Sequence, residues 1–201
     1  HYLHRRQRQM CIRDSSLSDG FVITVLFWIV LSVSGSIPFL LFGFSVVDSF
    51  FESMSGITTT GATVIAGLDD LPKSLLIYRQ LLQWLGGMGL IVLAIAVMPL
   101  LGIGGGQLFK TQTPGPMSEQ RLTPRITSTA RALWSIYFVL TVLCILAYRL
   151  AGMNNFDAVS HAFSTVSIGG FSTHDLSIGF FNSLSIEIVC ITFMLLSAMS
   201  F

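Results

Sequence analysis

Long apolar segments alternate along this chain with shorter, more polar ones. Residues 21–43 contain no charged side chain. As an α-helix, a segment of this length reaches roughly 34 Å, enough to cross a hydrocarbon core of about 30 Å. Residues 74–101 and 130–152 are apolar in the same way, and another apolar segment occupies residues 180–201. The pattern therefore predicts four membrane-spanning helices.

Two amphipathic segments lie between these helices and are too short to cross a bilayer. Residues 45–57 and 154–164 would reach roughly 20 Å or less as helices. Each runs into a turn rich in serine, threonine and glycine, at residues 58–63 and 165–173. A short helix followed by such a turn indicates a segment that enters the membrane and returns to the same side.

The two short segments are copies of one another. Asp48 and Asp157 are 109 residues apart, and so are Gly61 and Gly170. With the same offset, the third spanning helix aligns in sequence with the first, and the fourth aligns with the second. An internal repeat of this kind in a membrane protein predicts a duplicated re-entrant pore loop, and hence a protein that moves ions.

The repeat also divides the chain. We expect a first helix–pore loop–helix unit at residues 16–101, a connector at residues 102–128 and a second unit at residues 129–201. Since residue 101 corresponds to position 210, we expect the second unit to be truncated. Residues 1–15 are basic, lack a signal peptide's apolar core, and end in a run that back-translates to a sequence resembling the transposon end used in sequencing libraries. We expect this leader to be non-native.

Composition supports an all-α membrane protein with four spanning helices and two re-entrant pore helices. The chain is 52% hydrophobic and 10% charged, whereas soluble domains are about 25% charged. Its net charge of +1 gives no reason to expect a nucleic-acid partner. Residues 102–131 carry four cations, Lys110, Arg121, Arg125 and Arg131, whereas acidic residues gather beside the pore loops. The positive-inside rule therefore predicts a cytosolic connector and pore loops that face outside.

The turns have the chemistry needed to bind a dehydrated cation. Such an ion needs several oxygen dipoles in place of its water shell, and unpaired backbone carbonyls can supply them. Glycine permits backbone conformations that aim successive carbonyls at one axis. Serine and threonine add hydroxyl oxygens, and the short helix directs its partially negative C-terminus toward the ion. Residues 58–62 and 167–171 both meet these requirements.

These loops resemble those of the Trk/Ktr/HKT superfamily of cation transporters, in particular the bacterial TrkH-type potassium-uptake subunits. The similarity extends over about residues 18–201 and includes Tyr-Arg-Gln-Leu-Leu-Gln-Trp-Leu-Gly-Gly-Met-Gly at residues 78–89 and Thr-Pro-Gly-Pro at residues 113–116. In that family four helix–loop–helix units surround one pore. This chain has two such units, and it has the suspect leader where members carry additional helices, so we expect the segment alone not to conduct.

The resemblance also implies the site and its surroundings. It assigns one filter wall to Thr59, Thr60 and Gly61 and another to Ile168, Gly169 and Gly170, with potassium bound at these residues. Glycine at the filter position is associated with potassium, and serine with sodium in plant relatives. The resemblance further implies a bacterial plasma-membrane location, a homodimer and a cytosolic nucleotide-binding regulatory ring.

Several single residues have simpler explanations. Asp48 and Asp157 are expected to cap the N-termini of the short helices. His161, which is equivalent to Glu52, is expected to be a hydrogen-bonded packing residue rather than a pH sensor. Arg79 and Glu187 are expected to lie near a membrane face and extend to its surface, with a functional role for these intramembrane charges as the alternative. The small residues at 86–89 are expected to permit close helix packing, with a gating hinge as the alternative.

Other functions remain open at this stage. The chain could belong to a sodium-permeable protein, or to a cation-coupled secondary transporter that binds its substrate at broken helices near the midplane. An intramembrane enzyme has little support, because H-E-x-x-H and G-x-S-x-G motifs and paired intramembrane aspartates are missing from the sequence. We therefore expect no enzymatic activity and no cofactor. K⁺ is the transported ion that the resemblance implies.

Overall fold

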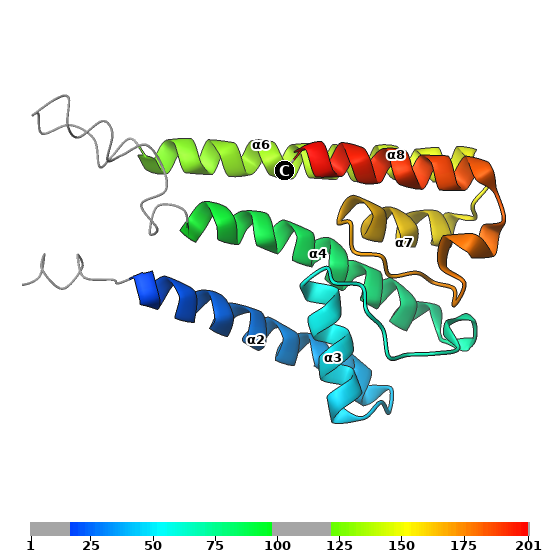
Figure 1. The fold of residues 1–201 in the computed structure, drawn as a ribbon, viewed down its shortest axis with the longest axis horizontal. Coiled ribbons are helices and arrows are strands. Elements are labelled where there is room, and N and C mark those ends of the chain that lie inside the picture. The colour runs from blue at the N-terminus through cyan, green and yellow to red at the C-terminus, as the bar shows by residue number, and fades with distance from the viewer. Residues whose placement is uncertain (1–16, 98–121, 201) are drawn as a thin grey trace, which may run out of the picture.

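The computed structural model describes residues 17–97 and 122–200, and every regular element in these ranges is a helix (Figure 1). The first repeat contains α2 (Leu17–Leu41), α3 (Val46–Ile57), the 3₁₀ helix η1 (Leu68–Asp70) and α4 (Lys73–Val97). The second contains α6 (Leu122–Leu150), α7 (Asn155–Val166), the 3₁₀ helix η2 (Ser177–Phe181) and α8 (Leu184–Ser200). Each repeat is therefore a long helix, a short helix, a loop and a second long helix.

The long helices lie along the long axis of the molecule, and the short helices pack between them (Figure 1). α3 packs against α2 and α4, and α7 packs against α6 and α8. α4 also packs against α7, so this helix of the first repeat contacts the short helices of both repeats. Both short helices are thereby brought against one helix, α4.

The predicted elements are present, with shifted ends. The first spanning helix, expected at residues 21–43, is found at Leu17–Leu41, and the second is described as far as Val97. α7 continues to Val166, two residues into the expected turn. α8 begins at Leu184 rather than at residue 180, because η2 and the left-handed Asn182 (φ 42°) come first.

One predicted boundary differs further. α6 begins at Leu122, inside the segment assigned to the connector, although Pro124 lies there. Proline is tolerated in the first turn of a helix, where its missing N–H has no intrahelical partner to lose. Residues 102–121 of the expected connector and the suspect leader at residues 1–15 lie outside the described residues.

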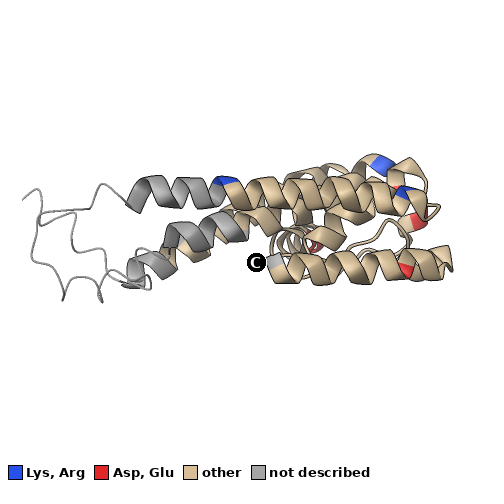
Figure 2. Cartoon of the chain, turned by 90° about the horizontal axis from the view of Figure 1, so that it is seen from above, with Lys and Arg blue, Asp and Glu red and all other residues tan. Residues whose placement is uncertain are grey.

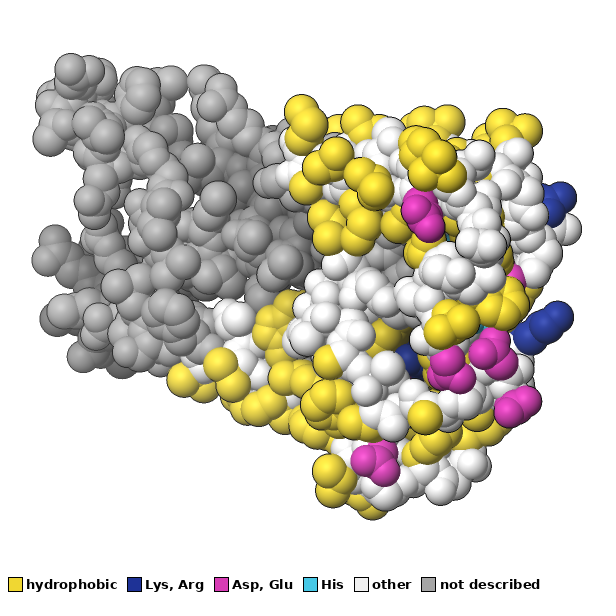
Figure 3. Space-filling view, turned by 45° about the vertical axis from the view of Figure 1, so that its right-hand side comes forward, with side chains coloured by type: hydrophobic (Ala, Val, Ile, Leu, Met, Phe, Trp, Pro, Cys, Tyr) yellow, Lys and Arg dark blue, Asp and Glu magenta, His cyan; other side chains and the backbone are white. Residues whose placement is uncertain are grey.

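The described part of the chain buries several charged and amide side chains among its apolar core residues and exposes large apolar side chains. Glu52, Arg79, Gln80 and Gln83 are fully buried, whereas large apolar side chains of α2 and α6 are exposed (Figure 3). The charged residues of the described part lie mostly at one end of the bundle (Figure 2). Windows in α2 and α6, Thr24–Leu41 and Arg131–Leu150, are long and apolar enough to cross a bilayer. Burying charge while exposing apolar surface is the arrangement expected of helices in lipid.

Candidate functional site

Both short helices begin in the same way, three residues before the predicted caps. The Ser45 hydroxyl accepts a hydrogen bond from the Asp48 N–H at 3.1 Å, and the Asn154 side chain accepts one from the Asp157 N–H at 2.8 Å. The prediction that the aspartates are the N-caps is therefore wrong: Ser45 and Asn154 occupy these positions. The aspartates lie in the first turn, where their charge still complements the helix dipole.

The first loop leaves α3 through a tight reversal of the backbone. The Thr59 N–H donates to the Gly56 carbonyl at 3.0 Å, and the Thr60 N–H donates to the Ser55 carbonyl at 2.9 Å. This pair of bonds is the Schellman motif, which requires a left-handed residue, here Thr59 with φ 54°. Glycine usually occupies that position, because a side chain there costs about 1–2 kcal/mol. The loop therefore stores backbone strain next to the predicted filter.

The second loop repeats this conformation. The Ile168 N–H donates to the Thr165 carbonyl at 3.1 Å, and the Gly169 N–H donates to the Ser164 carbonyl at 2.8 Å. Ile168 has φ 56°, matching Thr59, and Gly170 has φ 87°, matching Gly61 with φ 77°. Left-handed residues thus recur at the same two positions in each loop. A β-branched residue is strained in this region, and such strain concentrates at functional sites.

This backbone arrangement leaves carbonyl oxygens available. The N–H groups of each loop turn back onto the helix that precedes it. Within the described residues, the carbonyls of residues 58–61 and 167–170 accept no hydrogen bond. Unpaired carbonyls in an enclosed site are the groups that can replace the hydration shell of a cation.

The two loops come into direct contact at their glycines. A methyl group built on Gly61 would lie 1.9 Å from the Gly169 carbonyl oxygen and 3.5 Å from the Gly170 Cα. The sequence-predicted filter residues of both repeats are therefore brought together. The backbones approach so closely that no side chain fits at Gly61.

A buried ion pair lies directly behind the first loop. The Arg79 Nε donates to the Glu52 Oε1 at 2.7 Å, and Arg79 Nη2 lies 2.6 Å from the same oxygen. Both side chains are fully buried. The prediction that Arg79 extends to the membrane surface is therefore wrong, because Glu52 on α3 provides a partner in the interior. A buried charge is tolerated where it is paired and hydrogen-bonded.

The ion pair connects the outer ends of both loops. In the first loop, the Thr63 hydroxyl lies 3.0 Å from Glu52 Oε1, and the Val64 N–H donates to Glu52 Oε2 at 3.3 Å. In the second loop, Arg79 Nη1 donates to the Ser172 carbonyl at 3.2 Å. Glu52 and Arg79 therefore hold the segments that directly follow the two predicted filter walls.

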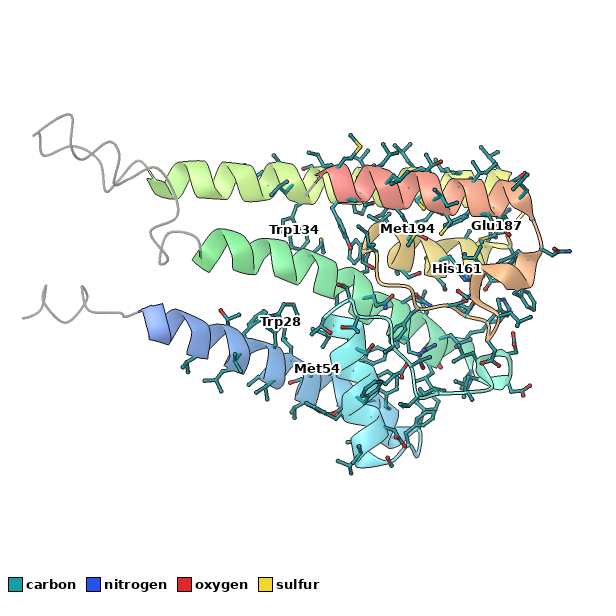
Figure 4. All side chains as sticks on the ribbon, in the orientation of Figure 1. Trp28, Met54, Trp134, His161, Glu187 and Met194 are labelled. Carbon is teal, nitrogen blue, oxygen red and sulfur yellow. The ribbon has the colours of Figure 1, made fainter. Side chains whose placement is uncertain are left out.

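His161 occupies the position equivalent to Glu52 and is buried on α7 (Figure 4). Its Nδ1 lies 2.9 Å from the Asp157 carbonyl and its Nε2 2.9 Å from the Ser172 hydroxyl. Ser172 is in turn equivalent to Thr63, so the contact between helix and loop is itself duplicated. The prediction that His161 is a hydrogen-bonded packing residue is confirmed.

A second set of contacts joins the repeats near η1. His174 pairs through Nδ1 with Asp69 of the first repeat, and its Nε2 lies 3.4 Å from Asp157. The Asp175 carboxylate accepts hydrogen bonds from the N–H groups of Gly67 and Leu68, each at 3.1 Å. The acidic residues beside the loops therefore connect the repeats as well as contributing negative charge.

The hydrogen bonds of Asp157 predict an acid-dependent contribution to stability. Burial alone would raise the pKa of this carboxyl group, but hydrogen bonds from Thr173, His174 and Asn154 lower it overall. A lowered pKa contributes stability above the unfolded value of about 3.9, and this contribution is lost as pH falls through the folded value. We expect the thermal unfolding midpoint of the complete protein to fall less steeply on acidification in Asp157→Asn. Identical pH profiles would contradict this.

Two glycines of α4 allow the backbone at the ends of α3 and α7 to pack closely against this helix. A methyl group on Gly86 would lie 1.9 Å from the Ile57 carbonyl oxygen, and one on Gly87 would lie 2.9 Å from the Tyr137 hydroxyl and 3.1 Å from the Ser167 Cβ. Both glycines therefore permit close packing, as the first of the two sequence interpretations predicted. No sequence signal singled out Gln83, which contacts the second loop.

The comparisons with known proteins agree on one family. A sequence model of the TrkH family, described as a cation transport protein, matches residues 3–201. The Trk system potassium uptake protein TrkH of Halomonas elongata is 61% identical over 203 residues, which cover 100% of this chain and 42% of that protein. TrkH of Escherichia coli K12 is 52% identical over 186 residues, covering 91% of this chain and 38% of the relative.

A solved structure shows the same architecture. The crystal structure of the potassium transporter TrkH from Vibrio parahaemolyticus matches with a TM-score of 0.77 and 55% sequence identity. The match covers 92% of this chain and 37% of that one. The predicted fold, an all-α membrane protein built from helix–pore loop–helix repeats, is confirmed. The chain spans about two fifths of the length of the relatives it matches.

Proposed function

Because this chain belongs to the TrkH family of cation transport proteins, we propose that the complete protein takes up potassium ions through a selectivity filter to which this segment contributes two walls. Thr59, Thr60 and Gly61 form one wall, and Ile168, Gly169 and Gly170 form the other. One observation carries the proposal: two loops with the same strained backbone meet at Gly61 and Gly169 and leave their carbonyl oxygens unpaired.

The ion is bound by replacement of its water rather than by covalent chemistry. Each loop presents carbonyl oxygens at the C-terminus of a short helix, where the helix dipole is partially negative. Glycine lies at the filter position in both loops, which favours K⁺ over Na⁺ by the family resemblance. The spanning helices α2 and α6 are continuous across the described residues, which gives no support to midplane binding at broken helices.

The distribution of charged residues supports one orientation of the protein in the membrane. Acidic residues beside the loops would concentrate cations at that face, so the loops open to the outside of a bacterial plasma membrane. The cations around residues 110–131 then face the cytosol. There they offer a contact surface to the nucleotide-binding regulatory ring that the family resemblance implies. The same resemblance implies that the complete protein is a homodimer without enzymatic activity.

Substitution of Gly61 tests the proposed filter. In the complete protein, Gly61→Asp should abolish growth rescue of a potassium-uptake-deficient bacterial strain, because the new side chain meets the Gly169 carbonyl and blocks the ion path. Gly43→Asp is the matched control: Gly43 also has positive φ, 96°, but a methyl group added there would meet no atom within 4 Å. Rescue by Gly61→Asp at the level of the unaltered protein would contradict the assignment.

A further inference from the structure

We propose that Arg79 and Gln83 of the first repeat are positioning residues for the filter loop of the second repeat. They hold the backbone that directly follows Gly170, so that ion selectivity at the second wall depends on α4. The inference rests on the proposed function and adds the two residues that set the geometry of one filter wall.

Gln83 holds the second loop by one hydrogen bond. Its Oε1 accepts from the Phe171 N–H at 3.1 Å, and Phe171 directly follows Gly170. The Gln83 side chain is fully buried. An N–H donor fixes which end of the amide faces the loop, because only the oxygen can accept. Removing this oxygen would leave the buried N–H of Phe171 without a partner.

The same amide supports the loop by contact. A methyl group on Gly169 would lie 2.4 Å from the Gln83 Cδ, 2.5 Å from Oε1 and 2.8 Å from Nε2. The Gly169 backbone therefore packs directly on the plane of the Gln83 amide, and the loop has no room to move toward α4. The amide thus limits the position of a residue of the proposed second wall.

Arg79, which lies one helical turn before Gln83 on α4, contacts Phe171 and Ser172 of the second loop. Its Nη1 donates to the Ser172 carbonyl at 3.2 Å, and its guanidinium lies 4.4 Å from the centre of the Phe171 ring. Residues four apart on a helix share a face, so Arg79 and Gln83 act on adjacent residues of the loop. Glu52 orients the guanidinium for both contacts.

The second repeat does not contain an equivalent pair of residues. The positions equivalent to Arg79 and Gln83 are Ile188 and Thr192 on α8, and the Thr192 hydroxyl donates to the Ile188 carbonyl of its own helix at 2.7 Å. Within the described helices the contact therefore runs in one direction, from the first repeat to the second loop. The arginine and the glutamine are therefore specific to α4 and are not part of the repeated pattern.

The test measures selectivity in the complete protein, reconstituted in lipid vesicles, as the ratio of K⁺ flux to Na⁺ flux. Gln83→Leu removes the acceptor at similar volume, and we expect the ratio to fall about tenfold, the effect of one hydrogen bond to a buried amide. Arg79→Lys keeps the charge near Glu52 but loses the planar fork, and should also lower the ratio.

Gln80→Leu is the matched control, since Gln80 is equally buried on α4 and its side chain contacts no polar partner in the described residues. Its flux ratio should not change. An unchanged ratio in folded Gln83→Leu, or an equal fall in Gln80→Leu, would overturn the inference. So would failure of both Gln83→Leu and Gln83→Met to fold while Gln80→Leu folds, because Gln83 would then serve stability alone. Absence of K⁺ flux in the unaltered protein would instead contradict the proposed function.

Discussion

Glu52→Gln is expected to destabilise the complete protein by about 3–5 kcal/mol, because it leaves the Arg79 guanidinium buried without a counter-charge. Both side chains are fully buried, so bulk solvent cannot take the place of the lost carboxylate. The substitution also weakens the acceptor for the Thr63 hydroxyl and the Val64 N–H. Thermal unfolding of the detergent-solubilised protein, followed by loss of helical signal, should show a markedly lower midpoint.

Two further variants isolate the ion pair. Arg79→Gln should destabilise by a similar amount, and the double variant Glu52→Gln/Arg79→Gln should lose much less than the sum, because the two residues share one interaction. Glu187→Gln makes the same chemical change at an exposed position of α8 and should have little effect. If Glu52→Gln unfolds like the unaltered protein, Arg79 reaches the membrane surface, as its place in the sequence had suggested.

Gly86→Ala is expected to reduce potassium uptake by about tenfold or more and to destabilise the protein by about 1–3 kcal/mol. The added methyl would lie 1.9 Å from the carbonyl oxygen, 2.7 Å from the carbonyl carbon and 3.0 Å from the Cα of Ile57. These are backbone atoms and cannot turn away as a flexible side chain would. Since Ile57 is the last residue of α3, its displacement would be passed to the filter residues that follow. Uptake per folded protein is the measurement.

Gly89→Ala provides the control on the same helix. A methyl group on Gly89 meets no atom of the described structure within 4 Å. Alanine is favoured over glycine in a helix by about 1 kcal/mol, so this variant should be as stable as the unaltered protein or slightly more so. Equal effects of Gly86→Ala and Gly89→Ala would show that helix flexibility, rather than close packing, is the role of these glycines.

The repeat and the short helices could be predicted because they depend on local pattern. Length and apolar composition identify the spanning helices, and the constant offset of 109 residues pairs Gly61 with Gly170 before any contact is known. The two N-caps that were predicted wrongly also depend on local structure. Ser45 and Asn154, not the more conspicuous aspartates, cap α3 and α7, because a cap must lie outside the first turn.

The partners of the buried polar groups depended on the tertiary structure. Glu52 and Arg79 are 27 residues apart, and Arg79 and Ser172 are 93 apart, so no local period relates them. Arg79 near a helix end has the same sequence signature whether it reaches the membrane surface or turns inward. Packing of α4 between α3 and α7 decides between these outcomes, because it places Glu52 and the second loop within reach of one side chain. The sequence alone therefore determined the repeated loops and their chemistry, whereas the three-dimensional arrangement decided which residues hold them in place.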